Sequence, residues 1–168
     1  MRLQNYLRES LGMNIEVKKV SECSKKELQN FFKLVDFEKQ AFTNVATIKS
    51  KGSYLAFCHI DGTLAGVSSL KKPFRVKDVF TEAGIPEMIN KVKYEIGWSV
   101  TLPEHRGKRI NYLLHKELFE VAEGDVFGTV RDNNVSSLAL VKKLGMEQVG
   151  EPFEGLGNYN ILTFIYRR

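Results

Sequence analysis

Hydrophobic residues recur along the chain with two different periods, which predict a succession of strands and helices. A period of two indicates a strand, and a period of about 3.6 indicates a helix. The patterns predict strands at residues 14–19, 54–60, 63–70, 94–101, 125–131, 147–150 and 158–166. They predict helices from 24 to about 41 with a looser stretch to 48, near 87–92, from 107 to 123 before Gly124, and from 134 to 144.

Capping and turn residues mark several of these boundaries. Ser24 and Glu27 form a capping box, and Asp61-Gly62 is a strong hairpin signal between two strand patterns. Strands separated by helices imply parallel pairing, whereas hairpins imply antiparallel pairing. The predicted class is therefore α/β, with a mixed central β-sheet flanked by helices, and residues 1–168 are expected to form a single domain.

Charge and cysteine content narrow the function classes. Lys and Arg number 25 against 20 Asp and Glu, for a net charge of +5. No run of like charge is present, so nucleic acid is an unlikely partner. Cys23 and Cys58 form no metal-ligand motif, and we expect no metal. Two lone thiols, no export signal and no apolar stretch of membrane length predict a cytoplasmic protein.

The segment from Val100 to Asn111 carries the clearest chemical signal. A strand ends, a turn containing Gly107 follows, and a helix begins. The first turn of a helix offers unpaired backbone N–H groups and a partial positive charge, which together bind anions. Arg106, Lys108 and Arg109 add positive charge, so the segment predicts a phosphate or pyrophosphate site. The spacing is neither that of a P-loop nor that of a dinucleotide fingerprint.

This segment resembles the acetyl-CoA pyrophosphate loop of the GNAT superfamily of N-acetyltransferases. The matching residues are Val100, Pro103, Arg106, Gly107 and Ile110, and a second motif from Asn134 to Met146 follows the family spacing. The chain departs from the family at four positions: Arg109 replaces the second glycine, Asn111 replaces Gly or Ala, Val141 replaces the usual Tyr, and Met146 replaces Phe.

The resemblance implies a GNAT-like acyl-CoA N-acyltransferase fold with acetyl-CoA as cosubstrate. In that fold the strands at 94–101 and 125–131 splay apart to admit the cofactor. An acceptor amine then attacks the thioester directly, in a ternary complex. The cofactor-binding residues expected by position are Trp98, Ser99, Val100, Arg106, Gly107, Lys108, Arg109, Ile110, Asn111, Asn134 and Ser137.

Two residues are candidates for proton transfer. Glu95 would accept the proton of the amine, although it could instead pair with a nearby Lys or Arg; a carboxylate in a central strand is uncommon. Because Val141 cannot protonate the leaving thiolate, Tyr159 is the candidate substitute, with water as the alternative. Trp98 is expected in the core on a strictly alternating strand, and His115 on a helix surface without a role.

Three functions therefore stay open. The first is acetyl transfer to a small-molecule or peptide amine by a monomer or homodimer. The second is a catalytically weak or inactive CoA-binding module, which Arg109 and Val141 favour. The third is acetylation of a nucleic-acid-linked amine such as aminoacyl-tRNA, suggested by the net charge and the basic residues between 71 and 93.

Overall fold

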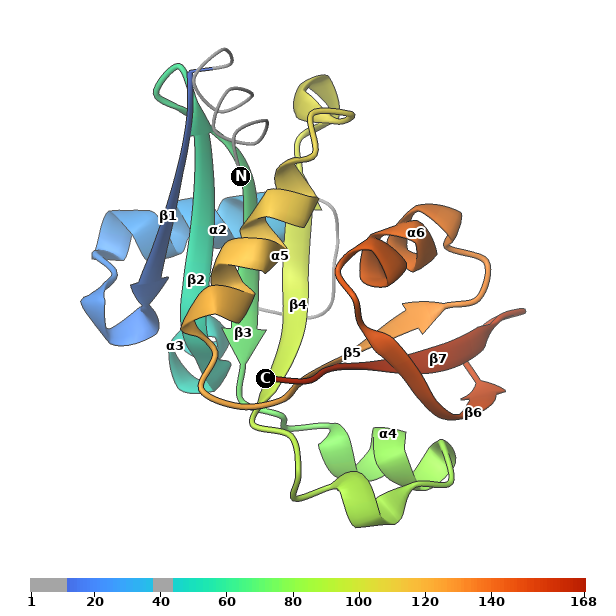
Figure 1. Ribbon diagram of the computed structural model, residues 1–168. Coiled ribbons are helices and arrows are strands. Elements are labelled where there is room, and N and C mark those ends of the chain that lie inside the picture. Colours follow the sequence, from blue (N-terminus) through green and yellow to red (C-terminus); the bar gives the residue numbers. More distant parts are fainter. Residues whose placement is uncertain (1–11, 38–43) are drawn as a thin grey trace. The chain divides into compact units, whose positions relative to one another are not determined.

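The computed structural model describes residues 12–37 and 44–168 (Figure 1). Within these residues, seven strands form one mixed sheet in the order β1-β2-β3-β4-β5-β7-β6. The elements in chain order are β1 (Met13–Lys19), η1 (Val20–Glu22), α2 (Lys25–Phe37), α3 (Val45–Lys51), β2 (Gly52–Ile60), β3 (Thr63–Lys71), α4 (Val76–Glu82), η2 (Pro86–Met88), β4 (Tyr94–Thr101), η3 (Pro103–His105), α5 (Ile110–Val121), β5 (Val126–Arg131), α6 (Val135–Lys143), β6 (Glu147–Glu154) and β7 (Asn160–Tyr166). The predicted mixed α/β fold is confirmed.

The described residues divide into two compact units. The first contains the residues up to Ser69 together with Trp98–Leu118, and the second contains Leu70–Gly97 and Phe119–Arg168. Strands β3 and β4 and helix α5 each contribute residues to both units. The two units are therefore described separately below.

In the first unit, β1 and β2 pair antiparallel from Met13 opposite Ile60 to Lys19 opposite Tyr54. The predicted hairpin joins β2 to β3. Its turn residues, Asp61 and Gly62, have φ values of 48° and 79°. Positive φ at both central positions is the geometry of a type I′ turn, which Asp-Gly favours.

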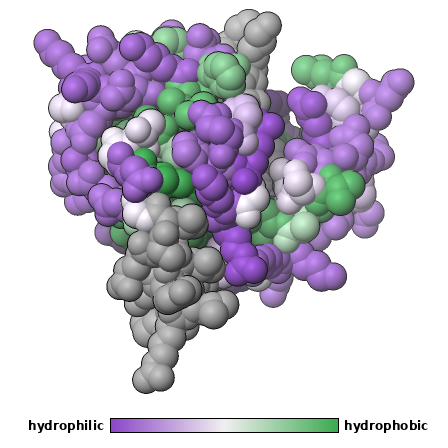
Figure 2. All heavy atoms as spheres, turned by 90° about the horizontal axis from the view of Figure 1, so that it is seen from above, coloured by the Kyte–Doolittle hydropathy of each residue, from purple (hydrophilic) through white to green (hydrophobic). Residues whose placement is uncertain are grey.

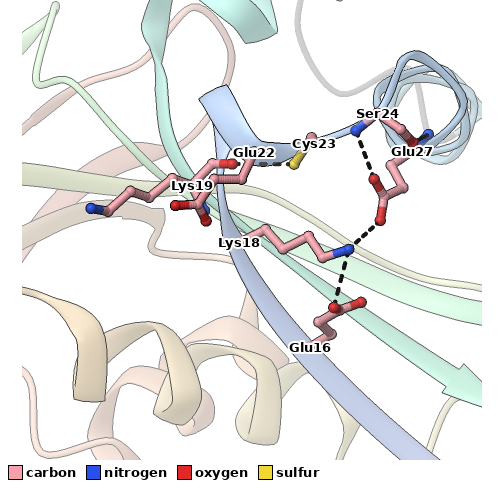
Figure 3. A network of polar contacts seen from close by, with 7 residues as sticks. All are labelled: Glu16, Lys18, Lys19, Glu22, Cys23, Ser24 and Glu27. Carbon is pink, nitrogen blue, oxygen red and sulfur yellow. Dashed lines mark hydrogen bonds and ion pairs between the residues drawn. The ribbon is translucent and has the colours of Figure 1, made fainter.

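Helix α2 begins at the predicted capping box. The Ser24 N–H donates to Glu27 Oε2 at 2.7 Å, and the Glu27 N–H donates to Ser24 Oγ at 3.2 Å (Figure 3). Lys18 Nζ lies 2.6 Å from Glu27 Oε1 and 3.1 Å from Glu16 Oε1. The contact with Lys18 is the main reason why the pKa of Glu27 falls to about 2. The Lys18 and Glu27 side chains are 27% and 29% exposed, so water screens the ion pair and it adds little stability.

The core of the first unit forms between α2, α3 and the sheet. Phe31 is fully buried and makes edge contacts with Phe57, at 5.8 Å between ring centroids, and with Trp98, at 6.4 Å. Val35 and Ile48 are also fully buried and belong to the same cluster. The apolar stripe of α2 that the sequence predicts is therefore the face that packs on β2 and β4.

In the second unit, β4 pairs parallel with β5, with Tyr94 opposite Val126 and Glu95 opposite Phe127. The strand β7 pairs antiparallel with both β5 and β6. Phe127 packs edge-on against Phe80 of α4, at 5.1 Å between ring centroids. The predicted parallel pairing in the middle and antiparallel pairing at the flanks is confirmed.

Several predicted boundaries were wrong. Helix α4 was not predicted, and a 3₁₀ turn at Pro86–Met88 stands where a short helix was expected near 87–92. Helix α5 spans Ile110–Val121 and so starts later than residue 107 and ends before Gly124. Strand β6 extends to Glu154, beyond the predicted end at residue 150. The end of the first predicted helix, at 38–41, lies outside the described residues.

Hydrophilic side chains cover most of the surface seen in Figure 2, and hydrophobic residues appear there as separate patches. The large hydrophobic side chains that are exposed among the described residues are Phe37, Phe74, Val135 and Leu156. Within residues 12–37 and 44–168, no helix is long and apolar enough to cross a membrane.

Candidate active site

Strand β4 departs from regular strand geometry at Trp98. Its φ of 49° lies in the left-handed region, yet Trp98 and Val100 are buried and Ser99 is half-buried, as the predicted alternation requires. The side chains of Trp98 and Val100 are 7% and 2% exposed and belong to the core of the first unit. A ligand lying along β4 would therefore meet the main chain at these residues, as the resemblance implies, and Trp98 is a core residue as expected.

The loop between β4 and α5 has two residues with left-handed backbone. Gly107 has a φ of 79°, and a Cβ built there would meet no atom within 4 Å. Arg109 has a φ of 60°, and its carbonyl accepts the first helical hydrogen bond from the Leu113 N–H at 3.1 Å. Left-handed backbone suits glycine best. Arg109 thus keeps the backbone conformation that glycine adopts most easily, although it carries a side chain.

The loop that precedes α5 carries three cationic residues: Arg106, Lys108 and Arg109. Arg106 Nε donates to the Thr101 carbonyl at 3.3 Å, so this side chain folds back over the end of β4. Lys108 Nζ lies 3.3 Å from His105 Nδ1. Arg109 is exposed. Together with the N–H groups of the first helical turn, these charges favour a bound phosphate.

Two buried polar atoms flank this loop without a hydrogen-bond partner among the described residues. They are Thr101 Oγ1, at the end of β4, and Asn111 Oδ1, in the first turn of α5. Buried polar groups are normally paired. Orphaned acceptors fit a site that takes N–H or O–H groups of a ligand, which the pantetheine arm of CoA carries. The open face at Gly107 and these two atoms are compatible with acetyl-CoA.

The Ser99 side chain makes two hydrogen bonds within the first unit. Ser99 Oγ lies 2.7 Å from Ser68 Oγ and 2.8 Å from His115 Nε2. The expectation that His115 lies on a helix surface was wrong, because its side chain is buried with 7% exposure. Burial lowers the pKa of His115 to about 4, so the imidazole is neutral at pH 7.

In the second unit, Glu95 is paired with a lysine. Lys71 Nζ lies 2.6 Å from Glu95 Oε1, and the two side chains are 9% and 15% exposed. The predicted alternative of an ion pair is thus confirmed, with Lys71 as the partner. Glu95 Oε2 is buried and has no hydrogen-bond partner among the described residues. That oxygen keeps its lone pairs for another group, so the pair does not occupy the whole carboxylate.

Sequence reasoning missed Lys71, which it placed in an irregular basic stretch. The one signal near it is Gly97: a Cβ built at Gly97 would approach Lys71 Cε and Nζ to 2.9 Å. A glycine inside a strand often marks such a close approach. Gly97 therefore leaves the space in which Lys71 lies across β4.

Residues of the second family motif cap helix α6 or pack in the protein interior. Asn134 caps this helix, since its Oδ1 accepts from the Ser137 N–H at 3.1 Å and from Ser136 Oγ at 3.0 Å. Val141 is 7% exposed and faces the protein interior. A cofactor contact by Asn134 would therefore use its amide nitrogen, because its oxygen is engaged in the cap.

Tyr159 lies just before β7, where the Arg131 guanidinium stands 4.5 Å from its ring centroid. Arg131 is the last residue of β5, whereas Glu95 is level with Phe127 near the start of that strand. A rise of roughly 3.3 Å per residue separates those two levels by about 13 Å. The backbone positions beside which the two predicted catalytic residues lie are therefore about 13 Å apart along β5.

No metal-binding group of His, Cys, Asp or Glu side chains occurs among the described residues. A hollow of about 600 Å³ lies at the end of β1 and β2 where Lys19 pairs with Tyr54. None of the predicted site residues lines it.

The mixed sheet, the glycine-containing loop and the helix that follows it define an acyl-CoA-dependent acyltransferase fold. Residues 20–146 of the 168 match the Acetyltransferase (GNAT) family. The chain belongs to the GNAT acetyltransferase family and is an acetyl-CoA-dependent acyltransferase.

Solved structures with this fold are distant in sequence. An acyl-CoA N-acyltransferase from Pseudomonas aeruginosa superposes with a TM-score of 0.66 at 16% identity, covering 91% of this chain and 98% of that one. The yncA protein of Salmonella typhimurium, solved with its cofactor acetyl-CoA, gives 0.64 at 14% identity over 92% and 94%. The ribosomal-protein-alanine N-acetyltransferase of Brucella melitensis gives 0.63 at 14% identity over 91% and 99%. No curated protein sequence matches the chain.

Proposed function

We propose that this protein transfers the acetyl group of acetyl-CoA to a primary amine by direct attack. The observation that carries the proposal is the loop between β4 and α5, where Gly107 and Arg109 hold left-handed backbone beside the start of a helix. That backbone suits a bound pyrophosphate, and the adjacent cations match its charge.

The chain offers main-chain contacts along the cofactor's proposed path. The N–H groups of residues from Gly107 to Asn111 would bind the pyrophosphate, and the irregular backbone at Trp98, Ser99 and Val100 would bind the pantetheine arm. Asn134 and Ser137 of the second unit are carried over from the family motif. Acetyl-CoA, when bound, supplies an acetyl group activated as a thioester.

Proton transfer is assigned to Glu95. A primary amine with a pKa near 10 is almost wholly protonated at pH 7, and it must lose a proton before it attacks. Glu95 Oε2 is the acceptor oxygen in this proposal, directly or through a water, while Oε1 stays with Lys71. A backbone N–H near Ser99 or Val100 would stabilise the negative charge that develops on the thioester oxygen.

Two relatives support the acceptor class that we propose. The Brucella protein named above is a ribosomal-protein-alanine N-acetyltransferase, and NAA60 of Arabidopsis thaliana, with a TM-score of 0.65 at 14% identity, was solved with a bisubstrate analogue. We propose a small-molecule or peptide amine as acceptor and a monomer or homodimer as the active form. Neither Cys23 nor Cys58 takes part in a disulfide among the described residues, which suits a reducing, cytoplasmic location.

A direct screen tests the proposal. The protein is incubated with acetyl-CoA and a mixed library of small-molecule and peptide amines, and mass spectrometry follows products heavier by one acetyl group. A thermal-shift titration with acetyl-CoA runs in parallel. Stabilisation with acetylated product supports an enzyme. Stabilisation without product supports the CoA-binding module that the buried Val141 favours, and the absence of both contradicts the proposal.

A further inference from the structure

A chain of hydrogen bonds crosses the core of the first unit from β3 to α5. Ser68 Oγ of β3 lies 2.7 Å from Ser99 Oγ of β4, which lies 2.8 Å from His115 Nε2 of α5. Three elements that are distant in sequence are thus joined through three side chains. None of these side chains is needed for the acetyl transfer described above.

The two ends of this hydrogen-bond network are buried, and Ser99 between them is half-buried. Ser68 is 0% exposed and His115 is 7% exposed. Burial alone lowers the pKa of His115 to about 4, so at pH 7 the link is made by a neutral imidazole. A buried polar group is costly to leave unpaired, so the hydrogen bonds between these side chains favour one packing arrangement of the three elements. The three side chains therefore hold α5 in one position on β3 and β4.

The positions of Ser99 and His115 relate this network to the cofactor loop. Ser99 lies two residues before the end of β4 at Thr101, and His115 lies five residues after the start of α5 at Ile110. Five residues of helix span about 7.5 Å. The hydrogen bond between them therefore ties together the strand that enters the loop and the helix that leaves it.

We propose that Ser68, Ser99 and His115 are positioning residues for the acetyl-CoA loop. By fixing α5 against β4, they hold the backbone of Gly107 and Arg109 and the N–H groups of the first helical turn in the arrangement that binds the pyrophosphate. This inference rests on the proposed function. It assigns His115 a part in cofactor affinity and none in proton transfer to or from the substrate.

Loss of the network should loosen the loop without unfolding the protein. Replacing His115 by Leu keeps a side chain of similar size and removes the link, and replacing Ser99 by Ala breaks it from the strand side. The loss of one hydrogen bond of this kind changes an equilibrium constant about tenfold. We expect the amides of residues 102–112 to exchange about tenfold faster and the affinity for acetyl-CoA to fall about tenfold.

The experiment measures three quantities on each variant: hydrogen exchange of peptides covering residues 102–112, acetyl-CoA affinity by calorimetry, and the melting temperature. His115→Gln is the conservative variant, because its amide reaches the position of Nε2 and should restore exchange and affinity. Val67→Ala is the matched control. Val67 is 0% exposed, so its truncation leaves a cavity in the core next to Ser68, while the hydrogen bonds of Ser68, Ser99 and His115 stay in place.

The proposal is supported if His115→Leu and Ser99→Ala change loop exchange and affinity together while His115→Gln and Val67→Ala do not. It is overturned if loop exchange is unchanged in Ser99→Ala and His115→Leu, or if Val67→Ala has the same effect at an equal loss of melting temperature. If His115→Leu does not fold, Ser99→Ala decides by the same criteria. Failure of wild-type protein to bind acetyl-CoA is a separate result that overturns the proposed function and, with it, the cofactor role given to the network.

Discussion

Lys71 Nζ lies 2.6 Å from Glu95 Oε1, in a pair whose side chains are 9% and 15% exposed. A lysine at the end of β3 thus holds a carboxylate of β4 in place, and the glycine at position 97 leaves the room for it. Since Oε2 of the same carboxylate is buried and has no partner among the described residues, one oxygen is fixed and the other is available.

Glu95→Gln should lower kcat by about 10²–10⁴, because an amide cannot accept the proton that a positioned base removes. In wild-type protein the rate should rise with pH and then level off. Affinity for acetyl-CoA should stay within about threefold, since it depends on the main chain of β4 and the loop. Steady-state kinetics and calorimetry measure the two quantities.

The control for Glu95 is Glu123→Gln. Glu123 also pairs with a lysine, with Lys93 Nζ 2.7 Å from its Oε2, but the two side chains are 50% and 68% exposed. Its replacement should leave kcat unchanged. If kcat of Glu95→Gln equals that of the control at saturating acceptor, Glu95 is a structural partner of Lys71 and nothing more.

Gly107→Asp should abolish measurable acetyl-CoA binding while the protein folds normally. Gly107 has a φ of 79° with open space where a Cβ would stand, and Asp and Asn tolerate this backbone better than other residues. The added carboxylate would repel the pyrophosphate. Gly107→Asn is the uncharged match and should weaken binding far less, as should Lys108→Ala, whose solvated charge contributes modestly. Equal affinities of the Asp and Asn variants, measured by calorimetry, would argue against an anion at this loop.

Arg109→Gly should stabilise the protein, by up to about 1 kcal/mol. Arg109 has a φ of 60°, which strains a residue with a Cβ and costs glycine little. Part of the gain is offset because glycine has more freedom in the unfolded chain. Arg109→Ala keeps the Cβ and should show no gain in denaturant unfolding. Acetyl-CoA affinity should change by less than about threefold in both variants if only the backbone of Arg109 faces the ligand.

The sequence predicts those parts of the fold that depend on near neighbours. The capping box at Ser24 and the turn at Asp61 each involve residues within three positions of one another, and each is found where expected. The loop with Gly107 could be predicted because its chemistry lies in one continuous segment. Its most informative departure, Arg109, has a φ of 60°, in the left-handed region that glycine adopts most easily.

Contacts between distant segments could not be predicted in this way. Lys71 and Glu95 are separated by 24 positions, and Ser68 and Ser99 by 31. The periodicity of hydrophobic residues does not predict which distant side chains come into contact. We expected His115 on the surface of a helix. It is buried because α5 packs against β3 and β4, which carry Ser68 and Ser99. Tertiary packing alone gives this histidine its environment.

Stability should depend on pH through His115. Its pKa is lowered to about 4 in the folded protein from about 6.5 for the free side chain. Below pH 6.5 the unfolded chain therefore binds more protons than the folded one, so stability falls as the pH drops towards 4 and is unaffected by this group above 6.5. The shift corresponds to at most about 3 kcal/mol. Denaturant unfolding of wild-type and His115→Gln protein from pH 7.5 to 4.5 measures it, and parallel curves for the two proteins would contradict the assignment.

Tyr159→Phe should leave kcat within about threefold of wild type. As a general acid, Tyr159 would protonate the departing thiolate close to the place where Glu95 takes the proton of the amine. Tyr159 stacks on Arg131, whereas Glu95 lies opposite Phe127. Arg131 and Phe127 are four residues apart on β5, which corresponds to about 13 Å along the strand. A thiolate with a conjugate-acid pKa of about 8.5 can take its proton from water at neutral pH, so no acid from the chain is required. Arg131→Gln is the matched control for lost stacking, since it removes the cation and keeps the hydroxyl. A fall in kcat of tenfold or more in Tyr159→Phe alone, with an altered alkaline limb of the pH profile, would make Tyr159 the acid after all.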